Sequence, residues 1–183
     1  MKRLRTAFAV LAIAALPAGA VAVPATATAA GCSTTWGSLN KAGTGSAAST
    51  LQTVRAGRHA CFDRLVFDIK GPAPAVTARY VTNVFRAGAG HLVPLRGGAK
   101  MEIAISVQDE RHADGSWGFQ PPNSDELANV TGFRTFRQVA DANSNSAAQF
   151  IGLGLRARLP YRIFTLDGPG ANSRVVVDVA HHW

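Results

Sequence analysis

Short runs that alternate apolar and polar residues are the feature that most constrains the fold of this sequence. In residues 101–107, Met101, Ile103 and Ile105 fall on one side, and residues 64–69 alternate in the same way. Successive side chains of a β-strand point to opposite faces, so this pattern is typical of strands with one buried face. Both segments are therefore predicted to be half-buried strands.

The rest of the chain after residue 30 repeats this pattern and contains no sustained apolar stripe of helical period. Glycine and proline turns, such as 71–72 and 168–170, separate the runs. The further strands are predicted at residues 76–84, 91–95, 133–140, 149–155, 161–166 and 174–180. Seven or eight short strands in a chain of 183 residues indicate one mainly β domain, an antiparallel β-sandwich or barrel.

Two segments depart from simple alternation. Residues 43–50 are rich in Gly, Ser and Thr, so residues 31–50 are predicted to be a flexible lead-in to the domain at 31–183. Phe133 and Phe136 are three positions apart inside an expected strand. That spacing indicates a β-bulge or a single helical turn.

Residues 1–30 have the layout of a secretory signal peptide. Lys2, Arg3 and Arg5 precede an apolar run, and small residues at 25–29 match an A-x-A cleavage site. We therefore expect a secreted protein, extracellular or associated with the cell wall. No later stretch is apolar enough to span a bilayer, so no transmembrane anchor is expected.

The two cysteines, Cys32 and Cys61, are expected to form a disulfide, because an exported protein enters an oxidising compartment. Neither lies in a C-x-x-C motif. Lipidation of Cys32 is the alternative, since small residues precede it. A large aliphatic residue is expected three positions before a lipidated cysteine, however, and Ala29 occupies that position.

The chain is basic even without its leader. Of 19 Lys and Arg, 16 remain after Lys2, Arg3 and Arg5 are removed, against 11 Asp and Glu. The arginines are spread out rather than blocked, which favours a solvated β-surface; weak attraction to an anionic wall polymer is the functional alternative. Without a basic helix or an aromatic–basic stripe, nucleic acid is not an expected partner.

A short pattern that occurs twice in the sequence predicts a contact between two strands. Residues 64–68 and 174–178 both read Arg, three apolar residues, Asp. Arg and Asp four positions apart lie on the same face of a strand. If the two strands are neighbours, their charges form a cross-strand ladder above a packed apolar face.

Two sequence blocks resemble a known family. Residues 57–68 (Gly-Arg-His-Ala-Cys-Phe-Asp-Arg-Leu-Val-Phe-Asp) and residues 152–183, which include Arg-Ala-Arg-Leu-Pro-Tyr-Arg and Arg-Val-Val-Val-Asp-Val-Ala-His-His-Trp, resemble the secreted AMIN-like domain proteins common in actinobacteria. The resemblance implies a β-sandwich that acts as a non-catalytic binding module of the cell envelope. It also implies a ligand such as peptidoglycan.

No motif indicates catalysis, a cofactor or a metal. G-x-S-x-G, P-loop and H-E-x-x-H patterns are missing, and the acidic residues at 109–115 lack EF-hand spacing. His181 and His182 are adjacent on a strand and so point to opposite faces. The protein is therefore not expected to be an enzyme. The alternatives are a protein–protein interaction module of the cell surface and, with less support, a small secreted hydrolase.

Four residues are predicted to contact the ligand. Trp117 lies in a polar loop where its ring is expected to be exposed, and Arg156, Arg158 and Arg162 fall within seven positions. Aromatic rings are common platforms for sugars. Neighbouring guanidinium groups bind carboxylates or phosphates. The partner predicted from these residues is peptidoglycan, another anionic wall polymer or an envelope protein.

Overall fold

The computed structural model describes residues 31–32, 34–108, 115, 118–142 and 148–183. The predicted leader at 1–30 lies outside these residues, and residues 32–183 form one compact unit with its own core. All regular structure in the described part is β, and no helix there is long and apolar enough to cross a membrane.

Eleven strands are present in the described residues. They are β1 (Lys41–Gly43), β2 (Thr50–Arg58), β3 (Phe62–Lys70), β4 (Val76–Val81), β5 (Val84–Phe85), β6 (Leu92–Val93), β7 (Ala99–Ile105), β8 (Phe136–Asp141), β9 (Gln149–Leu155), β10 (Tyr161–Asp167) and β11 (Ser173–Ala180).

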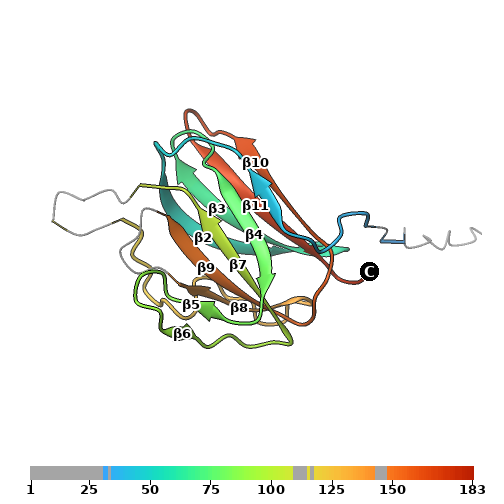
Figure 1. Cartoon of the computed structure of the whole chain (residues 1–183). Helices are drawn as coiled ribbons and strands as arrows, with labels where there is room; N and C mark the ends of the chain where they lie inside the picture. The colour runs from blue at the N-terminus through green and yellow to red at the C-terminus, as the bar shows by residue number, and fades with distance from the viewer. Residues whose placement is uncertain (1–30, 33, 109–114, 116–117, 143–147) are drawn as a thin grey trace, which may run out of the picture. The chain divides into compact units, whose positions relative to one another are not determined.

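The strands form a β-sandwich, as predicted (Figure 1). One sheet has five strands in the order β1-β4-β7-β9-β8, and the other has four in the order β10-β11-β3-β2. Every paired strand is antiparallel to its neighbour. Buried side chains from both sheets make a single apolar core between them.

The alternating residues form this core. Met101, Ile103 and Ile105 of β7 are fully buried, and so are Leu65 and Phe67 of β3. The residues between them lie on the opposite faces of the sheets, where Glu102 of β7 pairs with Arg79 and Val66 of β3 is buried. The pattern that predicted half-buried strands therefore also identified the inward face of each strand correctly.

Strands β1 and β2 were not predicted. Strand β1 lies within the segment 31–50 that was expected to be a lead-in, and β2 begins at the last residue of that segment. In β2 the register shifts between Leu51 and Thr53, so Leu51 and Val54 are both buried although they are three positions apart. This bulge hides the period-2 signal. The lead-in itself contains β1, which pairs with β4, so part of 31–50 belongs to the sheet.

A bulge was one of the two expectations for the spacing of Phe133 and Phe136, but the register shift lies after Phe136, and Phe133 is in the turn before the strand. Strand β8 begins only at Phe136, and its register with β9 shifts between Phe136 and Gln138. The Phe133 ring stacks on Phe136 with 5.8 Å between centroids. Both rings therefore pack on the core side even though only one of them belongs to the strand.

A short hairpin, β5–β6, covers the outer face of the five-stranded sheet. It divides the single strand predicted at 76–84 into β4 and β5. Val84, Val93 and Leu95 pack there in a second apolar cluster. Gly154 of β9 permits this approach, because a Cβ at that position would overlap the carbonyl oxygen of Arg96.

The only two tyrosines of the chain join the five-stranded sheet to the segment before β10. Their rings meet edge to face at 5.6 Å. The Tyr161 hydroxyl donates toward the carbonyl oxygens of Ala78 (2.6 Å) and Leu39 (2.8 Å). The Tyr80 hydroxyl donates to the Leu159 carbonyl and accepts from its N–H. The pair therefore fixes the lead-in and the β9–β10 connection against β4.

Stability should fall at alkaline pH because of this pair. Burial, with a contribution from Tyr80, raises the pKa of Tyr161 from 10.0 to about 12. Unfolded tyrosine ionises at a pKa of about 10, so the contribution of Tyr161 is complete below that pH and is lost as pH rises through about 12. We expect urea denaturation to show a loss of about 2 kcal/mol between roughly pH 9 and pH 12. An equally steep decline in Tyr161→Phe, which cannot ionise there, would contradict this assignment.

Candidate ligand-binding face

The outer face of the five-stranded sheet is covered by the β5–β6 hairpin and its apolar cluster. Among the described residues, no such cluster covers the outer face of the four-stranded sheet. The register places alternate residues of its four strands on this face. They are Thr53, Arg55, Gly57, Phe62, Arg64, Val66, Asp68, Arg162, Phe164, Leu166, Arg174, Val176 and Asp178. Six of these residues are charged, and four of the six, Arg64, Asp68, Arg174 and Asp178, are those predicted to form a cross-strand ladder.

The predicted charge ladder is present in the centre of the face. Arg64 lies opposite Asp178, and Arg174 lies opposite Asp68, in neighbouring strands β3 and β11. Arg64 donates to both Asp178 oxygens, at 2.6 and 2.9 Å. Arg162 of β10 donates to the same carboxylate at 2.8 Å. Asp178 is thus fully buried between two guanidinium groups, which compensate its charge.

Aromatic rings hold the Arg162 end of the ladder. The Arg162 guanidinium lies 4.4 Å from the Trp36 ring centroid and 5.1 Å from that of Phe164. The ring of Phe62 lies 5.7 Å from Trp36, edge to face. These cation–π contacts, together with Asp178, fix the orientation of Arg162. Its side chain remains 41% exposed, so one edge of this ordered guanidinium faces solvent.

The other end of the ladder is arranged differently. Asp68 accepts two hydrogen bonds from Arg55, at 2.6 and 2.8 Å, and one from Thr53 at 2.7 Å. The Arg55 guanidinium, followed by Thr53, holds the pKa of Asp68 below its ordinary value. Arg174 donates from Nη2 to the Asp167 carbonyl at 3.3 Å. Its Nε is buried and has no hydrogen-bond partner among the described residues.

A depression of about 280 Å³ opens between these arginines. Val66 and Val176, both buried, and the bare backbone of Gly57 lie beneath it. Arg55, Arg64 and Arg174 line it together with Ala56, His59 and Leu166. Three cations around an apolar floor suit a small group that carries an anion next to a methyl or methylene.

This face belongs to the part of the chain that matches a family model. The model of the AMIN-like domain matches residues 49–181, which is most of the chain. The chain belongs to the AMIN-like domain family. Comparison with curated proteins and with solved structures finds no match. Membership in this family suggests a binding module related to the cell envelope.

Both sequence blocks that resemble the family meet on the outer face of this AMIN-like domain. Residues 57–68 supply the end of β2 and most of β3, and residues 152–183 supply β10 and β11. Strand β3 pairs with β11, so the blocks lie side by side although more than 80 residues separate them. Most of both blocks therefore lies in the four-stranded sheet, while residues 152–155 belong to β9 of the other sheet.

The structure directs the three predicted arginines to different surroundings. Arg162 lies on the outer face. Arg156 donates to the His181 carbonyl at 2.5 Å, and Arg158 donates to Ser38 while its guanidinium lies 5.0 Å from the Tyr80 ring. Trp117 lies outside the described residues. Arg174 was predicted to lie in the ladder. Arg55 was not predicted, because the bulge in β2 breaks the alternation by which that strand could have been recognised.

The disulfide between Cys32 and Cys61 is present, with 5.3 Å between the Cα atoms, as predicted. It joins the segment that leads to Trp36 to the residue before β3. His181 N donates to the Cys61 carbonyl at 2.9 Å, so the last strand ends beside the same bridge. The bridge thus supports the aromatic end of the outer face.

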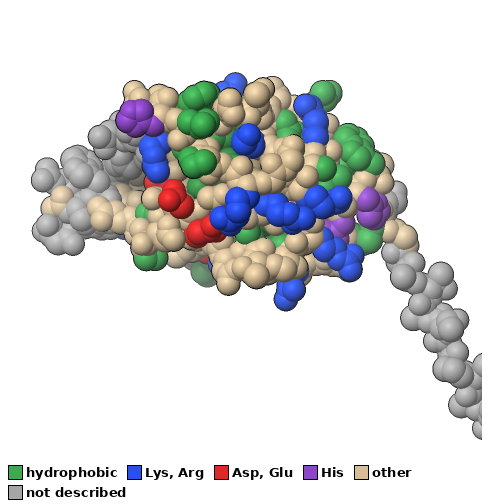
Figure 2. All heavy atoms as spheres, turned by 90° about the horizontal axis from the view of Figure 1, so that it is seen from below, with side chains coloured by type: hydrophobic (Ala, Val, Ile, Leu, Met, Phe, Trp, Pro, Cys, Tyr) green, Lys and Arg blue, Asp and Glu red, His purple; other side chains and the backbone are tan. Residues whose placement is uncertain are grey.

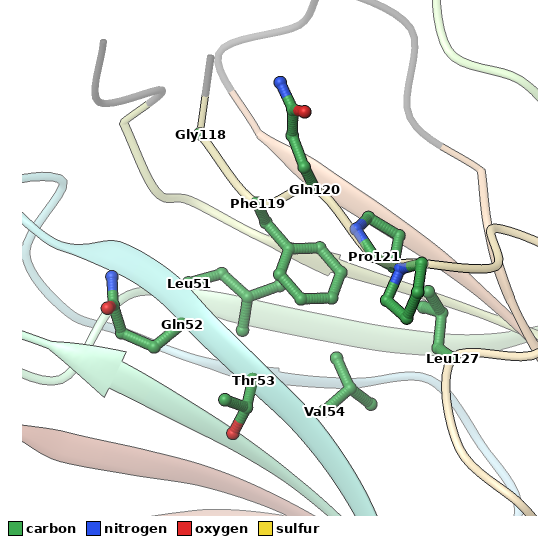
Figure 3. Close-up of a pocket in the computed structure, with 10 residues that line it drawn as sticks. Leu51, Gln52, Thr53, Val54, Gly118, Phe119, Gln120, Pro121 and Leu127 are labelled. Atoms are coloured by element: carbon green, nitrogen blue, oxygen red, sulfur yellow. The ribbon is translucent and has the colours of Figure 1, made fainter. Parts of the chain in front are cut away.

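Two other depressions lie elsewhere on the AMIN-like domain. One, of about 340 Å³, is bordered by Arg96, Arg137 and the turn at 131–133, on the side where Figure 2 shows basic side chains in a row. The other, of about 280 Å³, lies beside β2. There the Phe119 ring points between Leu51 and Pro121 (Figure 3). Phe119 also packs on the core, so its ring closes the edge of the sandwich.

Proposed function

We propose that this AMIN-like domain is a secreted, non-catalytic module that binds the cell wall, and that it holds a carboxylate of peptidoglycan in the depression on the outer face. The leader pattern at 1–30 and the disulfide support an extracellular site of action. The depression lined by Arg55, Arg64 and Arg174 carries the assignment of the binding site.

The state of Arg174 is the observation that favours a ligand there. A buried N–H without a partner costs about 1–3 kcal/mol. The Nε of Arg174 is such a group, while the guanidinium groups of Arg55 and Arg64 are already satisfied by carboxylates. An anionic oxygen that enters the depression would meet the Arg174 guanidinium, which donates to the neutral Asp167 carbonyl rather than to a carboxylate.

Peptidoglycan carries the chemistry that the depression fits. Its stem peptides present carboxylates next to the methyl groups of alanine. A volume of about 280 Å³ is below that of pockets for drug-sized ligands, so it suits one such group rather than a length of glycan chain. Val66 and Val176 would contact the methyl, and the arginines would contact the carboxylate.

Replacement of Arg174 should weaken binding to the wall. We expect the chain 31–183 with Arg174→Gln to bind purified sacculi, stripped of wall polymers, about ten- to a hundredfold more weakly, because charge-assisted hydrogen bonds are lost. Co-sedimentation over a protein concentration series measures this. Retention by the unchanged domain should persist at high salt, since a shaped site is screened less than exposed charge.

Arg79→Gln is the matched control, because Arg79 is an exposed cation paired with Glu102 on the other sheet. It should change retention less than twofold. Equal losses in the two variants, or no retention of the unchanged domain at any salt, would reject the proposed site. Release of soluble sugar or peptide from the sacculi would reject the non-catalytic role.

A further inference from the structure

A row of arginines crosses a different side of the molecule, along the edge strand β8 and the turn before it (Figure 2). Its members, identified by the contacts below, are Arg58, Arg137 and Arg96, and Arg134 is exposed in the turn that leads into β8. The Arg58 guanidinium lies 5.9 Å from the Phe133 ring centroid, and Arg137 donates to the Phe133 carbonyl. Arg96 in turn donates to the Arg137 carbonyl. These contacts make the row continuous.

The arginines of this row have fewer carboxylate partners than the arginines on the faces of the two sheets. On the two sheets, Arg55, Arg64, Arg79 and Arg162 all pair with carboxylates. Arg137 instead donates to three neutral carbonyl oxygens, those of Phe133, Phe136 and Arg134. Within the described part of the chain, Glu126 is the row's one ion-pair partner, at 2.5 Å from Arg96. Figure 2 shows acidic side chains only toward one end of the row.

Two arginines of the row, Arg96 and Arg137, are already held in place by the protein. Three carbonyls fix the Arg137 guanidinium, and Arg96 is fixed by the Arg137 carbonyl and Glu126. Side chains that are already immobile lose little conformational entropy on binding. Between Arg96 and Arg137 lies the depression of about 340 Å³, where Thr131 adds a hydroxyl and Gly132 leaves the turn without a side chain. One phosphate group fits such a hollow.

We propose that this row binds a linear polyol-phosphate polymer, with successive phosphodiesters in contact with successive guanidinium groups. Arginine suits phosphate oxygens because it donates two parallel hydrogen bonds. A row of exposed cations, rather than one enclosed pocket, matches an extended polyanion. This inference is independent of the carboxylate site proposed above, because the two surfaces share no arginine.

A membrane of anionic lipid offers the same phosphate chemistry but is a poorer fit. Peripheral membrane-binding surfaces combine basic residues with exposed apolar side chains that insert between lipids. The large apolar residues that are most exposed in the described structure are Leu39, Phe85, Leu92, Leu166 and Trp183. None of them borders the hollow between Arg96 and Arg137.

The test uses purified poly(glycerol phosphate) and the double variant Arg58→Gln/Arg134→Gln. Both side chains are exposed, and neither donates a hydrogen bond to the rest of the described structure, so the fold should tolerate the change. At about 50 mM salt we expect at least a tenfold loss of affinity by titration calorimetry. The dependence of affinity on salt should also become shallower, because fewer counterions are released from the polymer.

The matched control is Arg79→Gln/Arg86→Gln, which removes two ion-paired cations outside the row, one exposed and one half-buried. It should lose less than twofold, and Arg58→Lys/Arg134→Lys should keep most of the affinity. Arg174→Gln should bind the polymer normally, and the row variant should bind polymer-free sacculi normally, so the two proposals fail separately. Equal losses in the row and control variants would overturn the proposal, as would tighter binding to phosphatidylglycerol vesicles than to the polymer.

Discussion

Replacement of Asp63 by alanine is expected to lower the free energy of unfolding by about 3–5 kcal/mol, because it removes one partner of a buried charged network. Asp63 begins the core side of β3 and is fully buried. One carboxylate oxygen accepts the backbone N–H groups of Thr135 (2.6 Å) and Phe136 (3.2 Å). The other lies 3.1 Å from Nε2 of His181.

This carboxylate joins the two sheets at the end of the sandwich near the disulfide. Thr135 and Phe136 lead into β8 of the five-stranded sheet, and His181 follows β11 of the four-stranded sheet. Nδ1 of His181 lies 3.2 Å from the Ala60 carbonyl oxygen, so each ring nitrogen faces an acceptor oxygen. Alanine at position 63 would leave the donors that contact this carboxylate buried without a partner.

Urea denaturation of three variants tests the role of Asp63. Asp63→Asn keeps one acceptor oxygen and should lose less stability than Asp63→Ala. Asp68→Ala removes a half-exposed carboxylate from the same strand and should cost about 1 kcal/mol or less, as surface ion pairs do. If Asp63→Ala cost no more than Asp68→Ala, the network would not hold the sheets together.

Removal of the disulfide should have the second largest effect. The bond joins residues separated by 29 positions, and closure of a loop of that length in the unfolded chain corresponds to about 3–4 kcal/mol. We expect Cys32→Ser/Cys61→Ser to lose that much, measured by chemical denaturation under oxidising conditions. The loss should come mainly from a more disordered unfolded state, so far-UV circular dichroism of the folded variant should be unchanged.

Reduction provides the control for the disulfide. A reductant should destabilise the unchanged chain by the same amount and leave the double serine variant unaffected. A midpoint that does not move when the unchanged chain is reduced would show that the loop is held closed by other contacts, such as that of Trp36 with Phe62.

The strands that could be predicted most closely from the sequence are those that no bulge interrupts. Strands β7, β9 and β11 are continuous apolar-rich runs, and β7 pairs with β9, and β11 with β3, without a register shift; their predicted bounds are nearly those observed. Sequence analysis failed at β2, because a bulge puts Leu51 and Val54 on the same side, and at β1, whose three residues carry no pattern. It also could not predict that β5–β6 returns over the five-stranded sheet, although Gly152 and Gly154 mark the place of contact.

The candidate site could also be predicted only in part, because it depends on contacts between strands that are distant in the sequence. The echo of Arg-x-x-x-Asp predicted the pairing of Arg64 with Asp178, because charge and spacing within two strands suffice for that. The depression needs four strands in a particular order, with Gly57 and Val176 brought together from opposite halves of the chain. Closeness in sequence favoured Arg156, Arg158 and Arg162, yet Arg156 and Arg158 hold the β9–β10 connection in place.

The disulfide also determines how the domain would respond to a mechanical load. A force applied between Cys32 and Trp183 passes through the sulfur bridge to Cys61, at the start of β3, and to the end of β11. Phe62 pairs with Ala180 there, and the two strands are antiparallel, so both points of attachment lie at the same end of the pair. The force would open the hydrogen bonds one after another, as in a zipper, rather than shear them all at once. The pair β3–β11 would therefore separate at low force when the domain is pulled between these two points.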